Sequence, residues 1–522
     1  MSLNVKSGRR RSRRAGGRPN RAGDESKNMH LRVPYITRGI APYDLLDEGS
    51  LEKIEATSER IMAEIGFEFR DDPETVRLFQ QAGAKVREKS TDVWHLTFEP
   101  GMIREIMKTA PARFTQHARN PANTVEIGGD ATVLAPSYGC PFVMDLDNGR
   151  RYGTIRDFEN FVKLAQSSPW LHHSGGTICE PTDIAVNKRH LDMVYSHIRY
   201  SDRAFLGSIT APERVEDSID MCRILFGADF VEDNCVVMGN FNTTSPLVID
   251  GVTSRGIRAY AQAGQGSIHL PFLLGGAVAP LTMAGAVAQN LAETLVSAAI
   301  TQLVRPGAPA IIASFLSSMS MRSGSPTFGT PEPALGSLVM GQLARRLNLP
   351  LRCAGSFTTS KLPDAQAMQQ SMMSLMSAIQ SGGNYQLHSA GYLDGLLSMS
   401  YEKFVMDTDV LGAAHAYYAG IKVDDDALGF DALAENGPGE HLFSTQHTLR
   451  HYETAYWDSS LDDNQPWETW DEQGGIDMAT RANTRWKALL EKYEAPPLDA
   501  ATDDALKDFM ARKKATMADA WY

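Results

Sequence analysis

The chain has few cysteines and none of the motifs that mark the best-known catalytic centres. Its 522 residues include five scattered cysteines, an odd number, and none of them is spaced as CxxC. This argues against a disulfide framework or a zinc site of paired cysteines and predicts free thiols in a reducing, cytoplasmic compartment. A Walker loop, an HExxH helix and a Gly-x-Ser-x-Gly elbow are also absent. Their absence removes the commonest nucleotide, metalloprotease and serine-hydrolase sites from consideration.

Long uninterrupted apolar runs and an excess of positive charge are missing as well. The most apolar stretch, Leu270–Val304, is broken by two prolines, several glycines and polar side chains, so it suits a barrel interior better than a membrane span. The formal net charge of −12 argues against general nucleic-acid binding. Arg-rich residues 1–28 are not followed by the apolar segment of a secretory signal. We expect them to form a disordered basic tail.

Two flanking regions are expected around a central domain. Residues 29–130 contain the helical patterns Tyr43–Ile65, Asp72–Ala82 and Met102–Ala110, and we predict an N-terminal helical cap there. Residues 431–522 are loop-rich, with terminal helical patterns. We expect this C-terminal extension to pack around the central domain or onto a second subunit, which would make the protein a homo-oligomer.

Between residues 131 and 430, short apolar runs alternate with helical stretches. This alternation is typical of repeated βα units around a parallel sheet, and the predicted fold class is α/β, a TIM (β/α)8 barrel. An open doubly wound sheet is the alternative, but no GxGxxG follows a first strand. Ala131–Pro136 is either the eighth strand or a strand outside the ring. The other expected strands are Leu171–Gly175, Ala204–Ser208, Cys235–Asn240, His269–Gly275, Ala310–Phe315, Leu351–Gly355 and Asn384–His388.

The residues that follow the predicted strands are informative, because sites in parallel α/β folds gather at the carboxyl ends of strands. They include aromatic rings, amides and imidazoles but few carboxylates. Such a set suits a small cation held by ring faces, although Phe315 and Phe357 could instead merely plug the barrel. His172 and His173 are adjacent on a strand, so their side chains point to opposite faces and cannot easily bind one metal. We therefore predict no metal site.

Several long segments resemble the trimethylamine methyltransferase family. They occur in the expected order, and the resemblance runs from about residue 30 to the end of the Trp-rich segment near Trp470. The segments are Asn242–Asp250 (NTTSPLVID), Gly275–Phe315, Pro331–Gly355, Lys361–Ala367 (KLPDAQA), Ala390–Asp407 (with SYEKFVMD) and Glu435–Leu442 (ENGPGEHL).

The resemblance implies a TIM barrel that transfers a methyl group from a methylated amine to the cobalt of a separate corrinoid protein. It implies no tightly bound cofactor, since the partner supplies the corrinoid. The founding trimethylamine enzymes carry pyrrolysine, at a position that aligns near Gly355–Phe357, where this chain has ordinary residues. Members without pyrrolysine resemble glycine betaine methyltransferases and relatives that use proline betaine or carnitine. Glycine betaine or a similar quaternary amine is therefore the expected substrate. A trimethylamine methyltransferase without pyrrolysine remains an alternative.

The chemistry fits these residue types. A quaternary ammonium is already fully charged, so its departing amine needs no general acid, and Co(I) of the corrinoid provides the nucleophile. Aromatic faces grip such a cation, at roughly 0.5–2 kcal/mol each. The expected substrate-binding residues are Phe357, His388, Tyr392, Asn242, Phe315 and His173.

Three further assignments complete the sequence-based hypothesis. His388, Asn242 and Lys361 are candidate donors to a betaine carboxylate. Glu402 is a possible counter-charge, but a structural partner of Lys403 or an arginine is the favoured interpretation. A non-catalytic quaternary-amine sensor on the same barrel is the competing function. An unrelated barrel enzyme would need a carboxylate pair or a metal cluster, which the sequence does not offer.

Overall fold

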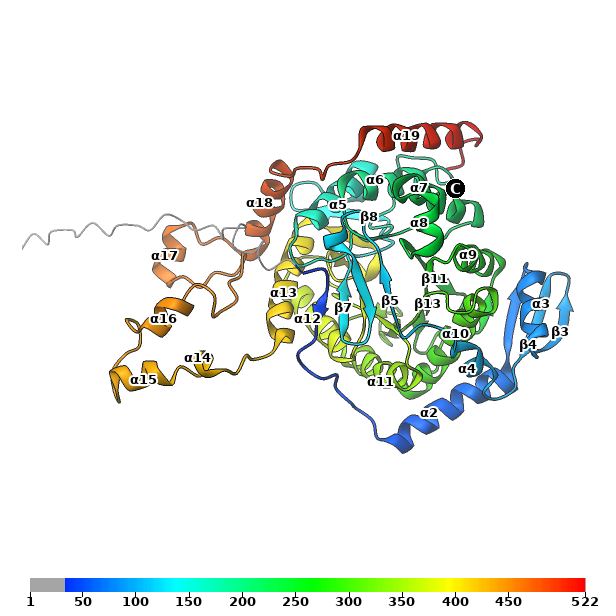
Figure 1. The fold of residues 1–522 in the computed structure, drawn as a ribbon, viewed down its shortest axis with the longest axis horizontal. Helices are drawn as coiled ribbons and strands as arrows, with labels where there is room; N and C mark the ends of the chain where they lie inside the picture. Colours follow the sequence, from blue (N-terminus) through cyan, green and yellow to red (C-terminus); the bar gives the residue numbers. More distant parts are fainter. Residues whose placement is uncertain (1–32, 522) are drawn as a thin grey trace, which may run out of the picture.

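The computed structural model describes residues 33–521, and it shows a mixed α/β fold in which helices surround a curled central sheet (Figure 1). The predicted basic tail, residues 1–28, lies outside the described residues. Among residues 33–521, no helix has the length and apolar character needed to cross a membrane.

The central sheet follows the order β10-β11-β13-β15-β18-β19-β7-β6-β5, with β1 (Ile36–Thr37) paired to β7 off this path. Every pair from β10 to β7 is parallel, whereas β7, β6 and β5 pair antiparallel. The alternation of βα units thus predicted the parallel part correctly. The strands are β5 (Arg113–Gln116), β6 (Val125–Gly128), β7 (Ala131–Leu134), β10 (Phe205–Leu206), β11 (Val237–Thr243), β13 (Gly266–Pro271), β15 (Ala310–Ala313), β18 (Leu351–Ala354) and β19 (Tyr385–Leu387).

Residues 171–175 connect the two ends of the parallel run. The backbone N–H of His172 donates to Leu134 O of β7 at 3.0 Å, and the N–H of Ser174 donates to Ala204 O at 3.0 Å. Leu206 N–H of β10 donates back to Gly175 O at 2.8 Å. The segment is therefore bonded to β7 on one side and to β10 on the other, and His173 and Ala204 form a parallel bridge.

Helices follow the strands and cover the outside of the sheet. Helix α5 begins at a capping box in which Thr154 and Asp157 satisfy each other's backbone N–H groups. Helix α10 is buried on nearly all sides. Its polar side chains bond to strand ends: Asn290 donates to Ala313 O at 2.7 Å, and Glu293 accepts from Thr243 at 2.6 Å. The helices are α5 (Ile155–Ser167), α6 (Arg189–Tyr200), α7 (Pro212–Phe226), α8 (Ala228–Asp233), α9 (Gly251–Gln262), α10 (Met283–Val304), α11 (Pro331–Leu347), α12 (Ala365–Gln380) and α13 (Tyr401–Ala419).

The region expected to form a helical cap also contains strands. Its helices are accompanied by a small sheet in the order β12-β2-β4-β3, of which the sequence pattern predicts only a short strand at Trp94–Phe98. Strand β12 comes from the loop after β11, so the cap is joined to the central domain by backbone pairing. The elements are α2 (Glu48–Arg60), a π-helical turn (Ile61–Ile65), β2 (Phe67–Arg70), α3 (Pro73–Gln81), β3 (Lys85–Ser90), β4 (Val93–Thr97), α4 (Met102–Met107) and β12 (Val248–Ile249).

The loops at the carboxyl ends of the parallel strands contain short strands and a turn of their own. Strands β20, β21, β8 and β9 form one small sheet, and β14, β16 and β17 form another. These elements are β8 (Phe142–Asp145), β9 (Gly149–Tyr152), β14 (Leu273–Leu274), β16 (Leu316–Met319), β17 (Pro326–Thr327), β20 (Tyr392–Leu393) and β21 (Ser398–Ser400), with a 3-10 turn at Asp394–Leu396. Another 3-10 turn, Pro121–Asn123, lies between β5 and β6.

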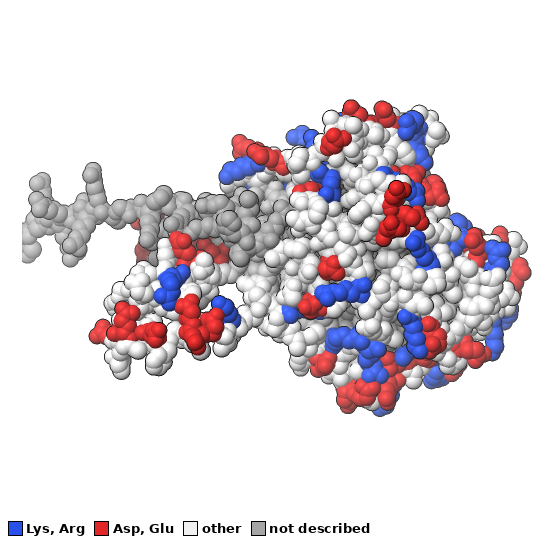
Figure 2. Space-filling model, in the orientation of Figure 1, with Lys and Arg blue, Asp and Glu red and all other residues white. Residues whose placement is uncertain are grey.

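The C-terminal region first projects from the body as a lobe, residues 420–476, and then returns (Figure 1). Figure 2 shows acidic side chains gathered on this lobe, which also exposes large apolar side chains such as Phe430, Phe443 and Tyr456. Helix α18 packs on α13, and α19 packs on α6 and α7. The elements are α14 (Asp425–Leu428), α15 (Phe430–Asn436), α16 (Gln446–His451), α17 (Trp467–Glu472), α18 (Met478–Glu491) and α19 (Ala500–Ala515).

Candidate active site

Four of the predicted site residues meet just beyond the ends of neighbouring strands. Phe315 follows β15, Phe357 follows β18, His388 follows β19 directly, and Tyr392 begins β20. All four are buried, with Phe315 the most exposed at 8%. His388 has a positive φ of 67°, which is uncommon for a residue other than glycine. The parallel pairing of β15, β18 and β19 brings these side chains together.

The rings are in mutual contact. Phe357 lies 5.5 Å from Phe315 between ring centroids, 5.1 Å from His388 and 5.6 Å from Tyr392. The Phe315 and Phe357 planes are only 21° apart, so these two rings are stacked. Two further phenylalanines, Phe272 and Phe328, extend the group and were not among the residues predicted from the sequence. We call the full set the aromatic cluster: Phe272, Phe315, Phe328, Phe357, His388 and Tyr392.

His388 is neutral at physiological pH. Burial is the main cause that holds its pKa well below the usual value, and the nearby charge of Arg352 adds to the effect. Its Nδ1 atom is buried and has no hydrogen-bond partner among the described residues. A neutral imidazole among ring faces presents a dipole without a competing positive charge, which is compatible with a bound cation.

Arg352 is a candidate site residue that the sequence patterns did not indicate. It lies on β18, its side chain is fully buried, and its guanidinium carbon is 4.9 Å from the centroid of Phe315. Burial lowers its pKa to about 10, so the group still carries its charge at neutral pH. One nitrogen is 3.4 Å from Ser314 O, a long contact. The only available signal was a charged residue inside an otherwise apolar strand.

His173 is buried and contacts Tyr385, which lies on the strand next to Arg352. The Tyr385 hydroxyl is 3.2 Å from His173 Nδ1, which also accepts the Gly175 N–H at 3.0 Å. Burial lowers the pKa of His173 far below its usual value. Tyr385 in turn is the register partner of Arg352 on the adjacent strand. Among the described residues, the ring contact of His173 is therefore with Tyr385 and not with the aromatic cluster.

Two of the three predicted carboxylate donors, Asn242 and Lys361, are exposed, unlike His388. Asn242 is exposed near the end of β11, and its backbone carbonyl accepts from Thr253 at 3.3 Å. Lys361 has a side chain that is 73% exposed, donates to Thr359 O at 2.7 Å and lies 3.7 Å from Asp394. Among the described residues, neither side chain forms a hydrogen bond or a cation–π contact with the rings of the cluster.

Glu402 is buried among neutral donors. Its carboxylate accepts from Asn483 at 2.8 Å, from the indole N–H of Trp486 at 3.0 Å and from the backbone N–H of Leu146 at 3.2 Å. Lys403 pairs with Asp407 instead of Glu402. The partners of Glu402 therefore come mainly from α18, and they join that helix to α13.

A buried ion pair holds the loop that carries Tyr392. Asp407 accepts from the Gly391 N–H at 2.8 Å and pairs with Lys403, whose ammonium also donates to Ser371 at 2.8 Å. Burial raises the pKa of Asp407 to about 6 and lowers that of Lys403. The Tyr392 hydroxyl donates to Tyr138 O. These contacts fix the Tyr392 ring against His388.

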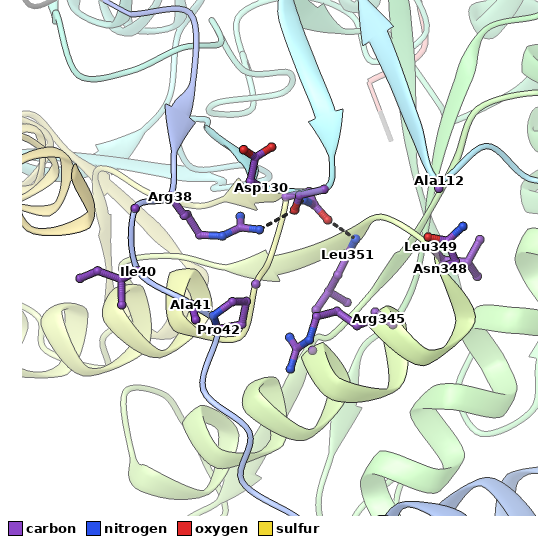
Figure 3. Close-up of a pocket in the computed structure, with 16 residues that line it drawn as sticks. Arg38, Ile40, Ala41, Pro42, Ala112, Asp130, Arg345, Asn348, Leu349 and Leu351 are labelled. Carbon is purple, nitrogen blue, oxygen red and sulfur yellow. Dashed lines mark hydrogen bonds between the residues drawn. The ribbon is translucent and has the colours of Figure 1, made fainter. Parts of the chain in front are cut away.

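A separate pocket of about 390 Å³ lies at the opposite, amino-terminal end of the strands (Figure 3). Its polar groups are largely satisfied within the chain. The Arg38 guanidinium donates to Gly129 O at 2.5 Å, Asn384 donates to the same oxygen at 3.0 Å, and the Leu351 N–H donates to Asn384 at 3.1 Å. We assign it a structural role. Within residues 33–521, no group of three or more His, Cys, Asp or Glu could hold a metal ion.

Comparison with known proteins gives a consistent family assignment. The family model described as Trimethylamine methyltransferase (MTTB) matches residues 9–518. A glycine betaine methyltransferase from Desulfitobacterium hafniense (strain Y51) is 39% identical over 475 residues, covering 91% of this chain and 98% of the relative. The proline betaine:corrinoid methyltransferase of Eubacterium limosum is 26% identical, covering 91% of this chain and 99% of the relative. A trimethylamine methyltransferase from D. hafniense (strain DSM 10664 / DCB-2) is 25% identical, covering 81% and 85%.

Proposed function

Because the chain belongs to the trimethylamine methyltransferase family, we propose that it is an enzyme that moves a methyl group from a quaternary amine to the Co(I) of a corrinoid protein. Glycine betaine or a similar betaine is the proposed substrate. The aromatic cluster is the observation that supports this function most directly: stacked and tilted rings around a neutral imidazole suit a permanent cation.

The proposed fold is a closed TIM (β/α)8 barrel. Adding residues 171–175 to β7, β10, β11, β13, β15, β18 and β19 gives eight parallel strands, and the hydrogen bonds of this segment to both neighbours support closure. We retain the proposed division into a cap at 29–130, a barrel at 131–430 and an extension at 431–522. The aromatic cluster then lies at the end of the barrel where sites of this fold gather.

The chain's part in the reaction is binding and orientation. Phe315, Phe357 and Tyr392 are proposed to grip the ammonium, while His388 and His173 contribute neutral dipoles. The exposed Asn242 and Lys361 suit the rim rather than the ammonium itself. The buried rings would exclude water and hold one methyl group towards the carboxyl ends of the strands, where the corrinoid protein is proposed to dock. The corrinoid supplies the nucleophile, and the departing amine needs no proton because its nitrogen already carries the charge.

The proposed partners follow from this arrangement. A corrinoid-binding protein would dock over the carboxyl ends of the strands and bring the cofactor with it, so that no tightly bound cofactor is needed on this chain. The lobe at 420–476, with its exposed Phe430, Phe443 and Tyr456, supports a homo-oligomer in which a second copy covers these side chains. The five free, buried cysteines fit the proposed reducing cytoplasmic location.

The test is a methyl-transfer assay with the full chain and a corrinoid protein reduced to Co(I). Glycine betaine, proline betaine, carnitine and trimethylamine are compared, and loss of the Co(I) absorption is followed. We expect turnover with a betaine and little with trimethylamine. Turnover with trimethylamine alone would favour the alternative substrate. Betaine binding without any change in the Co(I) spectrum would favour a sensor and contradict the proposed reaction.

A further inference from the structure

The charge of Arg352 is unbalanced in the described structure. The side chain is fully buried, and its Nε atom and one terminal nitrogen have no hydrogen-bond partner among residues 33–521. No Asp or Glu in that range forms an ion pair with it. A buried charge without a partner is costly, and native structures rarely keep one without a reason.

Two residues near Arg352 also carry buried polar atoms that have no partner among the described residues. Ser314, whose carbonyl is the 3.4 Å contact of Arg352, has a buried hydroxyl without a partner in the described part of the chain. The Nδ1 atom of His388 is likewise buried and has no hydrogen-bond partner among the described residues. The charge of Arg352 is close enough to contribute to the lowered pKa of this imidazole. Free donors and acceptors around one guanidinium are the groups that a bound carboxylate and its hydrogen bonds would satisfy.

Arg352 and the ammonium grip share one ring. Phe315 lies 4.9 Å from the guanidinium carbon, and its centroid is 5.5 Å from the stacked ring of Phe357. A cation bound on these rings would lie beside a second, uncompensated positive charge. In a poorly solvated site this repulsion is strong. A ligand that brings its own carboxylate removes it, because the bound zwitterion neutralises the guanidinium.

We propose that Arg352 binds the carboxylate of a zwitterionic substrate and, by repulsion, excludes quaternary amines that lack one. This inference rests on the proposed function and deepens it. Because one ring separates the two charged groups, the best substrates have a single carbon between nitrogen and carboxylate, as in glycine betaine and proline betaine. Carnitine, with a longer spacer, is expected to bind less well.

The test compares glycine betaine with tetramethylammonium, which has the same cationic head and no carboxylate. Calorimetric titration of the wild-type chain should show glycine betaine binding at least about 100-fold more tightly. In Arg352→Gln, betaine affinity should fall about 100-fold or more, while tetramethylammonium affinity stays the same or rises. Arg352→Lys, which keeps the charge without the bidentate fork, should lose about 10-fold for betaine. Arg223→Gln, on the exposed face of α7, is the charge-matched control.

The opposite changes for the two ligands separate recognition from a structural role. A structural arginine would lower both affinities together, or lower the melting temperature of the free protein; either result overturns the inference. Wild-type chain that binds the two ligands equally also overturns it, without any variant. If betaine binding shows the expected crossover but no methyl transfer occurs, the proposed function fails alone. If transfer from betaine is unchanged in Arg352→Gln, the inference fails alone.

Discussion

The carboxylate of Asp407 accepts a 2.8 Å hydrogen bond from the backbone N–H of Gly391, the residue directly before Tyr392. Since Asp407 lies within α13, one helix determines where a ring of the aromatic cluster is placed. Lys403, one turn earlier in the helix, neutralises Asp407. Asp407 is therefore a positioning residue, and its effect on substrate should act through Tyr392.

This arrangement predicts that substitutions in the Lys403–Asp407 pair change the free energy of unfolding and the KM for betaine differently. Lys403→Met leaves a buried carboxylate without its cation and should lower the free energy of unfolding by about 3–5 kcal/mol. The double variant Lys403→Met/Asp407→Leu should recover most of that loss in urea unfolding, yet its KM for betaine should rise because the Gly391 N–H has no acceptor. A double variant with an unchanged KM would show that the Tyr392 loop does not depend on Asp407.

Phe357 is the central ring of the cluster, so removing its aromatic face should weaken substrate binding. Phe357→Leu keeps most of the side-chain volume and should raise KM for betaine about 3–30-fold, in line with the loss of one cation–π contact. The substitution Phe230→Leu, at a ring that is 40% exposed on α8, is the control. Full activity and an unchanged KM in a folded Phe357→Leu would remove this residue from the proposed grip.

Glu402 is expected to stabilise the attachment of α18 rather than to balance the substrate charge. Glu402→Gln keeps an acceptor for Asn483 or Trp486 and should leave KM within about 3-fold, whereas Glu402→Ala should cost about 1–3 kcal/mol in unfolding free energy because buried donors lose their acceptor. Limited proteolysis should then cut near α18 sooner. A large rise in KM for Glu402→Gln at unchanged stability would instead support a counter-charge.

Buried histidines predict a stability that falls in acid. Burial lowers the pKa of His269 to about 3 and of His197 and His415 to about 4, and it lowers the pKa of His173 and His388 as well. The unfolded chain binds protons below about pH 6.5 that the native chain does not, so each histidine removes about 1.4 kcal/mol per pH unit between its unfolded and folded pKa.

Asp407 opposes this trend by one proton, since its folded pKa of about 6 lies above the unfolded value of 3.8. Calorimetric unfolding in buffers of different ionisation enthalpy should therefore show net proton uptake between about pH 6 and 5. Uptake should fall in His269→Gln, with exposed His441→Gln as the control. Proton release in that range would contradict the assignment of neutral buried histidines.

The repeating architecture could be predicted from the sequence because strand and helix periods differ. The apolar pattern of Thr282–Val304 predicts a helix, and α10 spans Met283–Val304 with Thr282 as its N-cap. The ends of strands were harder to place: β13 was expected at His269–Gly275 and is found at Gly266–Pro271. The helical spacing of its apolar residues predicts Met372 on the buried face of α12, but Met372 is 42% exposed, because the small side chains of Ser371 and Ala378 occupy that face.

Members of the aromatic cluster could be predicted from the sequence only where a ring follows its strand closely. Phe315, Phe357 and His388 satisfy that rule. Phe328 lies in the long loop between β15 and α11, directly after β17, and so could not be recognised in this way. Arg352 was missed for a different reason. A charged residue in a strand is normally assigned to a solvated face, whereas the Arg352 side chain is fully buried.

The left-handed backbone of His388 has one more consequence. Glycine would adopt a φ of 67° without strain, whereas an L-residue there raises the energy of the native state by roughly 1–2 kcal/mol. The substitution His388→Gly would therefore remove this strain, but it would also remove the imidazole. The backbone conformation that places this imidazole in the aromatic cluster therefore lowers the stability of the fold.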